Sequence, residues 1–160
     1  MPILSNSLYY PAFALTMFVF MLALVHRKEI KPLFWFSLVW GSGVDIFLIL
    51  LFHFLNLYIY LNDMPFDFYG SPILLNLAWT PAILLFIYFM PKQTGWFSYV
   101  LYLATFGMIG TLIGFFLQNA GLIKELHWHE LLRFPVITGW FYIAAWRYKI
   151  FKSKTVTSWK

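Results

Sequence analysis

Residues 96–118 read WFSYVLYLATFGMIGTLIGFFLQ, a stretch that contains no charged side chain. A transmembrane helix needs about 20 mostly apolar residues to cross a hydrocarbon core of about 30 Å, and this stretch is long enough. The 160-residue chain shares its character, with 62% hydrophobic and 11% charged residues. Soluble domains carry about 25% charged residues. The sequence therefore predicts an integral membrane protein.

Four further apolar segments surround this stretch, and short polar loops separate them. The five predicted transmembrane spans, in chain order, are residues 8–25, 33–58, 72–90, 96–118 and 133–149. Short loops favour one compact unit over a string of domains. We therefore expect a single domain over residues 1–160, an all-α helical bundle with five transmembrane helices.

The basic residues predict the orientation, because cytoplasmic loops of membrane proteins retain Lys and Arg. Nine of the eleven basic residues fall after the first span, after the third span or in the tail: Arg27, Lys28, Lys31, Lys92, Arg147, Lys149, Lys152, Lys154 and Lys160. These segments lie on one side, so we expect the N-terminus outside and the C-terminus inside the membrane.

The same distribution accounts for the net charge of +5. We therefore expect the basic tail to contact the anionic headgroups of the lipid bilayer. Nucleic acid is not an expected partner.

One carboxyl group, Asp45, lies in the middle of the second span. Burying a carboxyl near mid-bilayer costs about 2.5–3.5 kcal/mol, and such groups usually face the protein interior or a wet cavity. No span carries a basic residue at that depth, so we expect a protonated acid that donates a hydrogen bond to another helix. The candidate polar partners are Asn76, Thr80, Thr105 and Thr111. A structural hydrogen bond is favoured, and a proton relay or cation site is the alternative.

Small residues form a stripe on the fourth span at Gly107, Gly110 and Gly114. Small residues let two membrane helices approach closely. The preferred interpretation is packing within the chain against residues 41–43, and homodimerisation through the stripe is the alternative.

The segment KELHWHELLR, residues 124–133, gathers His127, His129 and Glu130 in a few positions. On a helix, residues two apart point to different faces, and the zinc-protease pattern HExxH is absent. We therefore expect an interface helix that forms an outer polar rim together with Asp63 and Asp67, without a metal ion or cofactor.

Within this rim, we expect His127 to approach Asp63 or Asp67. Arg133 is expected to extend to the headgroups. The last span alone is short, so its helix is expected to begin upstream of Pro135.

Two blocks carry a resemblance to a known family: GSPILLNLAWTPAILLFIYFMPK at residues 70–92 and WHELLRFPVITGWFYIAAWRYK at residues 128–149. In these blocks, and in pattern from about residue 18 to residue 149, the chain resembles the small, uncharacterised multi-span membrane proteins of spore-forming Firmicutes. The resemblance implies a location in a bacterial plasma membrane and a multi-span topology. It implies no activity and transfers no catalytic residue.

Three functions fit the sequence. The first is a non-enzymatic accessory or scaffold subunit that binds other membrane subunits or a second copy of the chain. The second is an oligomeric proton- or ion-coupled transporter or channel that uses Asp45. The third is an outer-face lipid or envelope enzyme that would use His127, Glu130, Asp63 and Asp67. The chain has no cysteine and shows no nucleophile motif, so we assign no catalytic residue and favour the first function.

Overall fold

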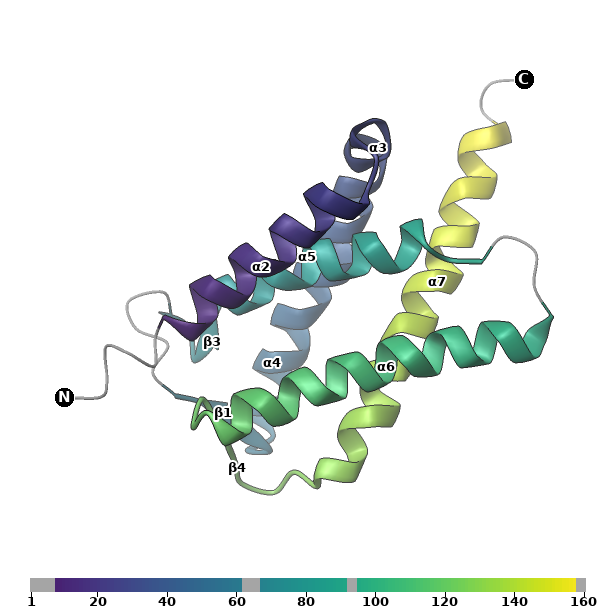
Figure 1. The fold of residues 1–160 in the computed structure, drawn as a ribbon. Coiled ribbons are helices and arrows are strands. Elements are labelled where there is room, and N and C mark those ends of the chain that lie inside the picture. The colour runs from purple at the N-terminus through teal and green to yellow at the C-terminus, as the bar shows by residue number, and fades with distance from the viewer. Residues whose placement is uncertain (1–7, 62–66, 92–94, 158–160) are drawn as a thin grey trace.

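The computed structural model describes residues 8–61, 67–91 and 95–157, and most of these residues are helical (Figure 1). The helices are α2 (Tyr9–Leu24), α3 (Arg27–Ser37), η1 (Leu38–Gly43), α4 (Val44–Phe54), α5 (Ile73–Tyr88), α6 (Trp96–Asn119) and α7 (Arg133–Thr157), with a short 3-10 turn η2 (Glu130–Leu132) before α7. Because α3, η1 and α4 follow one another without a break, the described residues form five helical rods. Each of the five apolar segments folds as one rod, so the all-α prediction is confirmed.

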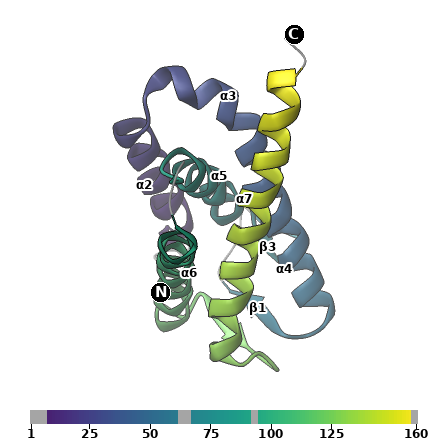
Figure 2. The same ribbon diagram turned by 90° about the vertical axis from the view of Figure 1, so that its right-hand side faces the viewer.

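The rods run alternately between two ends of the molecule (Figure 1). One end holds the start of α2 and the short strands, and the other end holds α3 and the end of α7. The rods are not parallel, because α5 and α6 are seen nearly end-on in Figure 2 while α4 and α7 run up the page. The α3–α4 rod and α7 therefore cross α5 and α6 steeply.

Length and composition distinguish the described helices from one another. Two of them, Arg27–Phe54 and Trp96–Asn119, are long and apolar enough to cross a membrane. The apolar helices α2 and α5 have 16 residues each, which is about 24 Å at 1.5 Å per residue. The structure thus contains two candidate membrane spans.

The second rod changes its helical geometry at η1, where the backbone forms a π-helical turn. Gly41 in this turn lies directly on α5, because a Cβ atom at Gly41 would approach the carbonyl oxygen of Trp79 to 2.5 Å. Beside it, the hydroxyls of Ser42 and Thr80 are 2.5 Å apart. The indole nitrogen of Trp140 on α7 donates a hydrogen bond of 2.7 Å to the carbonyl of Trp40. The π turn therefore joins α5 and α7.

The glycine stripe of α6 packs against α7. A Cβ atom at Gly110 would come within 2.8 Å of Ile137, and one at Gly114 would come within 2.6 Å of Arg133. Gly107 lies against Thr138 in the same way. The predicted packing of the stripe against residues 41–43 is wrong, because Gly41 is covered by the backbone of α5.

Two helices end in the same way and then feed one small sheet. Asn56 follows α4 at φ 53°, and Gly121 follows α6 at φ 71°. In each case, the next amide bonds back to the helix, from Leu57 to Phe52 and from Leu122 to Leu117. This arrangement is a left-handed helix cap. The strands that follow, β1 (Tyr58–Tyr60) and β4 (Ile123–Glu125), pair antiparallel.

The sheet closes one end of the bundle. The hydroxyl of Tyr10 donates to the carbonyls of Leu61 and Leu122, at 2.7 and 3.1 Å, and so fixes the start of α2 to both strands. A second ladder pairs β2 (Asp67–Phe68) with β3 (Ser71–Pro72) just before α5. The strand β4 contradicts the predicted interface helix over residues 124–133, since helix resumes only at η2 and α7. That α7 begins upstream of Pro135 agrees with the prediction.

Candidate functional site

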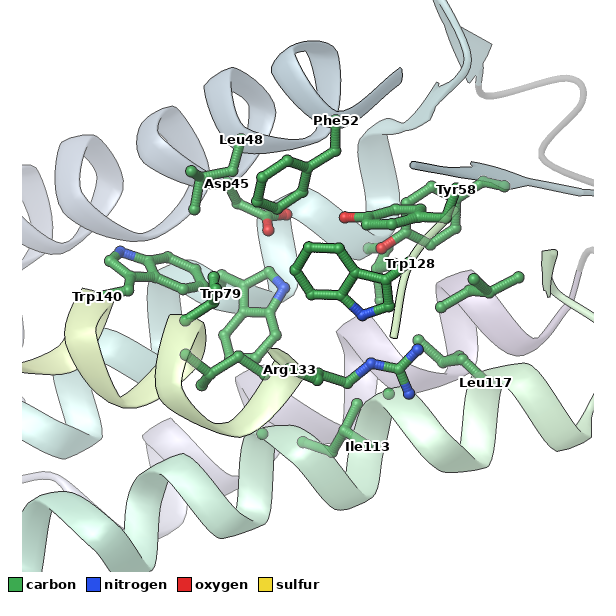
Figure 3. A pocket seen from close by; sticks show the side chains of 17 residues that line it. Asp45, Leu48, Phe52, Tyr58, Trp79, Ile113, Leu117, Trp128, Arg133 and Trp140 are labelled. Carbon is green, nitrogen blue, oxygen red and sulfur yellow. The ribbon is translucent and has the colours of Figure 1, made fainter. Parts of the chain in front are cut away.

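A cavity of about 80 Å³ lies between α4, α5, α6 and α7, beside the sheet of β1 and β4 (Figure 3). A water molecule needs about 10–15 Å³ of such space, so the cavity is large enough for several waters or one small ligand. Its polar and aromatic walls include Asp45, Tyr58, Trp79, Trp128, Arg133 and Trp140. We call this cavity the Asp45 pocket.

Asp45 is buried, with 7% of its surface exposed. Its carboxyl group points into the pocket toward Tyr58 and Trp128 (Figure 3). Its Oδ2 atom forms no hydrogen bond with any described residue. The structure therefore provides a buried carboxyl oxygen that is free to bind something else.

The predicted polar partners of Asp45 bind elsewhere. The hydroxyl of Thr80 pairs with Ser42, and Asn76 Nδ2 donates to Ser71 Oγ at 2.7 Å. On α6, the hydroxyls of Thr105 and Thr111 donate to carbonyls of their own helix, one turn earlier. The interhelical hydrogen bond predicted for Asp45 is therefore wrong for all four candidates.

Aromatic rings form most of the pocket wall. The ring of Trp128 lies 5.1 Å from that of Phe52 and 5.9 Å from that of Tyr58. On the opposite wall, Trp79 and Trp140 lie 4.9 Å apart at an interplanar angle of 55°. The indole nitrogen of Trp128 is buried and has no hydrogen-bond acceptor among the described residues. The pocket thus combines π faces with one donor and one acceptor that are not used.

Two tyrosines on β1 stand near the carboxyl group. Burial raises the pKa of Tyr58, and the charge of Asp45 raises it further. Burial likewise raises the pKa of Tyr60, with smaller contributions from Tyr58 and Asp45. Both phenols therefore stay protonated at neutral pH and present hydroxyl groups to this end of the pocket.

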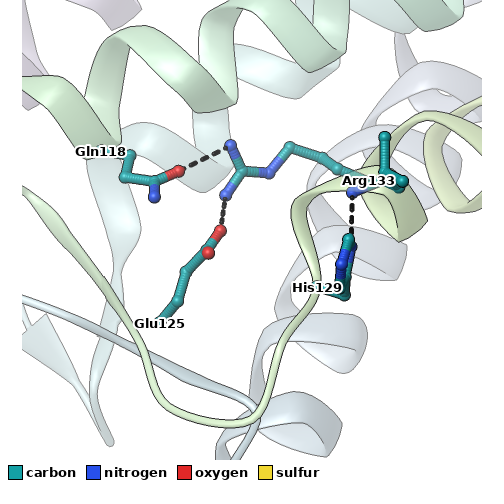
Figure 4. Close-up of polar contacts among 5 residues, drawn as sticks. Gln118, Glu125, His129 and Arg133 are labelled. Atoms are coloured by element: carbon teal, nitrogen blue, oxygen red, sulfur yellow. Dashed lines mark hydrogen bonds and ion pairs between the residues drawn. The ribbon is translucent and has the colours of Figure 1, made fainter.

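Arg133 lies inside the molecule, with 7% of its surface exposed, so the prediction that it reaches the headgroups is wrong. Its Nη2 atom pairs with Glu125 Oε1 at 2.6 Å, and its Nη1 atom donates to Gln118 at 3.3 Å (Figure 4). The guanidinium also lies over the ring of Phe115, 5.2 Å from its centroid. Because Gly114 has no side chain, the arginine can cross α6 at that point.

The two histidines of the outer segment do not converge. His127 Nδ1 lies 3.1 Å from the carbonyl oxygen of Asn56, whereas His129 Nδ1 accepts a bond of 3.3 Å from the amide of Leu131. Among the described residues, no three His, Asp or Glu side chains gather as metal ligands.

The acidic members of the predicted rim cannot be placed beside the histidines. Asp63 lies outside the described residues, and the side chains of Asp67 and Glu130 are not described. The contact predicted between His127 and Asp63 or Asp67 therefore stays a prediction.

Reasoning from the sequence identified Asp45 but missed Tyr58, Trp128 and Arg133 as its neighbours. One signal in the sequence could have pointed to Arg133. The spacing of the small residues includes Gly114, which leaves room on α6 for a long side chain from the next helix. Trp128 lies among charged residues in the sequence, a setting typical of a tryptophan at the membrane interface, so its neighbours do not point to a pocket.

Comparison of the chain with protein-family models, with curated proteins and with solved structures finds no match. The geometry of the Asp45 pocket is therefore the main guide to the function of the chain.

Proposed function

We propose that the chain is a multi-pass membrane protein, with its N-terminus outside, that binds and transfers protons or small cations at Asp45. The observation that carries this proposal is the buried Oδ2 atom of Asp45, which faces a cavity and has no hydrogen-bond partner in the described part of the chain. Asp45 thus takes the role of the coupling residue in a proton- or ion-coupled carrier or channel.

The outward surface supports a membrane location. Large apolar side chains point outward along the rods, among them Leu15, Val19, Trp35, Phe47, Leu112, Phe116 and Ile143. Polar side chains are buried instead, including Ser37, Ser42, Asn76, Thr80 and Thr111. Extensive exposed apolar surface marks contact with a membrane or a partner. With two helices already long enough to span, we propose that the three other rods cross as well.

The energetics of a buried acid support the proposal that Asp45 binds a proton or a cation. An ionised carboxylate in apolar surroundings is very unfavourable unless it is paired. Within the described residues, Oδ2 of Asp45 has no donor, so its occupant is either a proton or a cation from outside the chain. Acidic residues inside membrane segments commonly lie on proton or ion pathways. The π turn that ends at Gly43, just before Asp45, adds support, because π-helical turns are frequent at functional sites.

The test is ion flux through the purified protein in proteoliposomes. Proton and sodium influx are measured separately with entrapped indicator dyes under an imposed membrane potential. We expect Asp45→Asn to reduce the protein-dependent flux to the protein-free level. Glu29→Gln removes an exposed carboxyl on α3 and should leave the flux unchanged. Equal flux in the Asp45→Asn variant and the unmodified protein would contradict the proposal.

The other two hypotheses stay predictions. A defined partner retained on a mild-detergent pull-down would support the accessory-subunit hypothesis. Stoichiometric metal in the purified protein would favour an outer-face enzyme, although His127 and His129 already make separate hydrogen bonds.

A further inference from the structure

We propose that the Asp45 pocket binds a small organic ammonium ion. This inference rests on the proposed function and specifies the class of cation. It depends on three features of the pocket: its aromatic walls, its single uncompensated charge and its size.

The walls favour an organic cation over a bare metal ion. Hard metal cations prefer six or more oxygen ligands, whereas the described walls of this pocket offer one carboxyl group and two phenol oxygens. Trp, Tyr and Phe faces attract ammonium groups, and aromatic cages are the usual sites for quaternary ammonium ligands. Trp128 and Tyr58 provide such faces at one end of the pocket, and Trp79 and Trp140 provide them along the opposite wall.

The charges are also arranged for a cation. Arg133 lines the pocket, but its guanidinium is neutralised by Glu125 at 2.6 Å. Figure 3 shows the guanidinium turned toward Leu117, on the far side of Trp128 from Asp45. Among the described lining residues, Asp45 is therefore the group whose charge has no compensating partner. A bound ammonium group would provide that partner.

The size limits the ligand. A cavity of about 80 Å³ accommodates an ammonium group with its methyl substituents and excludes a polycyclic cation. Tyr58 on β1 and Trp128 after β4 line one end of the pocket. Strands β1 and β4 lie at the end of the molecule opposite the C-terminus (Figure 1). In the proposed topology this end faces outward, so the ammonium ion reaches Asp45 from outside.

The test is binding of choline to the full chain in nanodiscs made only of phosphatidylglycerol, which has no ammonium headgroup. Calorimetry compares choline with dimethylbutanol, in which an uncharged carbon replaces the nitrogen. We expect saturable choline binding and at least about tenfold weaker binding of the uncharged isostere. Equal affinity for the two compounds, or no choline binding, would overturn the proposal.

Matched variants identify the groups that bind. Asp45→Asn should lose choline binding. Trp128→Leu should weaken it about tenfold, whereas Trp128→Phe, which keeps an aromatic face, should retain most of it. Trp35→Leu changes a tryptophan that is 71% exposed on the second rod and should have no effect. Thermal unfolding shows which variants are folded, and unchanged binding in folded Asp45→Asn and Trp128→Leu proteins would overturn the assignment.

A second set of nanodiscs identifies the source of the ammonium group. If the natural occupant is a lipid headgroup, adding phosphatidylcholine should compete and weaken the apparent affinity for free choline. If the occupant is a free amine, the affinity should not change. Either result supports the ammonium site. If the flux depends on Asp45 while choline fails to bind, this inference is wrong and the proposed function stands.

Discussion

Gly41 and Gly43 lie two residues apart in the same π turn, yet their surroundings differ. A Cβ atom at Gly41 would meet the backbone of α5, including the carbonyl oxygen of Trp79 at 2.5 Å. A Cβ atom at Gly43 would meet its nearest atom at 3.7 Å, which is ordinary contact. Backbone cannot move aside as a flexible side chain can, so the close approach of the second rod to α5 depends on Gly41.

This difference predicts opposite effects for two alanine substitutions. Gly41→Ala should destabilise the protein by about 1–3 kcal/mol, the usual cost of overpacking. Gly43→Ala should be neutral or stabilise by up to about 1 kcal/mol, because alanine favours helix over glycine. Thermal unfolding in a mild detergent measures both. A Gly41→Ala protein as stable as Gly43→Ala would show that the two rods are not in close contact.

The buried phenols of β1 predict how stability depends on pH. Burial raises the pKa of Tyr58 and Tyr60 above the ordinary value of 10.0. Below pH 10.0 both phenols are protonated in the folded and unfolded states, so stability is unaffected. Above it, the unfolded tyrosines release protons that the folded protein retains, and stability should fall by up to about 1.4 kcal/mol per tyrosine for each pH unit.

The measurement for this prediction is the thermal midpoint as a function of pH. The double variant with Tyr58→Phe and Tyr60→Phe should lose less stability above pH 10.0 than the unmodified protein. Tyr69 is 78% exposed, and Tyr69→Phe should follow the unmodified curve. Identical pH curves for the double variant and the unmodified protein would contradict the burial of these phenols.

At the level of single residues, the sequence was sufficient to identify Asp45 as a candidate site residue, but it was not sufficient to predict its neighbours. An acid among apolar residues stands out because its burial is costly wherever the chain places it. Its neighbours depend on how the helices cross, and Thr80 illustrates the difficulty. Its hydroxyl lies in the interior as expected, but the π turn brings Ser42 to it.

At the scale of elements, the left-handed caps of α4 and α6 direct the chain into the pairing of β1 with β4. Gly121 adopts φ 71°, a conformation that costs a residue with a Cβ atom about 1–2 kcal/mol. Asn56 occupies the equivalent position after α4, and asparagine tolerates this left-handed conformation.

We therefore expect Gly121→Ala to destabilise the protein by about 1 kcal/mol or more. Gly139 lies within α7, and a Cβ atom there would meet nothing within 4 Å. Gly139→Ala is thus the control, and it should be neutral or slightly stabilising. Hydrogen exchange at the β1 and β4 amides tests the same point, since Gly121→Ala should accelerate exchange there. Unchanged stability and exchange would mean that the cap does not position the strand.

The helices followed from the sequence because each apolar run is long, whereas the strands did not. β1 is YIY and β4 is IKE, and three residues are too few to show an alternating pattern. Their pairing joins residues 58–60 to residues 123–125, a relation that no local pattern contains. The segment 124–133 was for that reason interpreted as a helix.

At the scale of the whole molecule, the alternating rods place the segment after β4 and the end of α7 at opposite ends (Figure 1). The chain contains no cysteine, so a single introduced thiol reports one position. Leu126 and Ser153 are both exposed, and neither belongs to the Asp45 pocket.

For the proposed topology, we expect a membrane-impermeant thiol reagent to label Leu126→Cys in intact cells. Ser153→Cys should be labelled only after the membrane is opened. Both variants should react in detergent, which controls for the accessibility of the thiols. Labelling of both positions from outside would show that α7 does not cross the membrane, and the reverse pattern would invert the orientation.

The bond between Tyr10 and Leu122 joins positions 112 residues apart, and this separation has a consequence for biosynthesis. At about 5–20 residues per second, the ribosome needs roughly ten seconds to synthesise the intervening chain. Leu61, whose carbonyl is the nearer acceptor of the Tyr10 hydroxyl at 2.7 Å, is translated about midway through that time. The wall that α7 supplies arrives later still, with Arg133 and Trp140. Asp45 and the whole of α4 are therefore translated long before the pocket has all of its walls, and the proposed ligand site is complete only after Trp140.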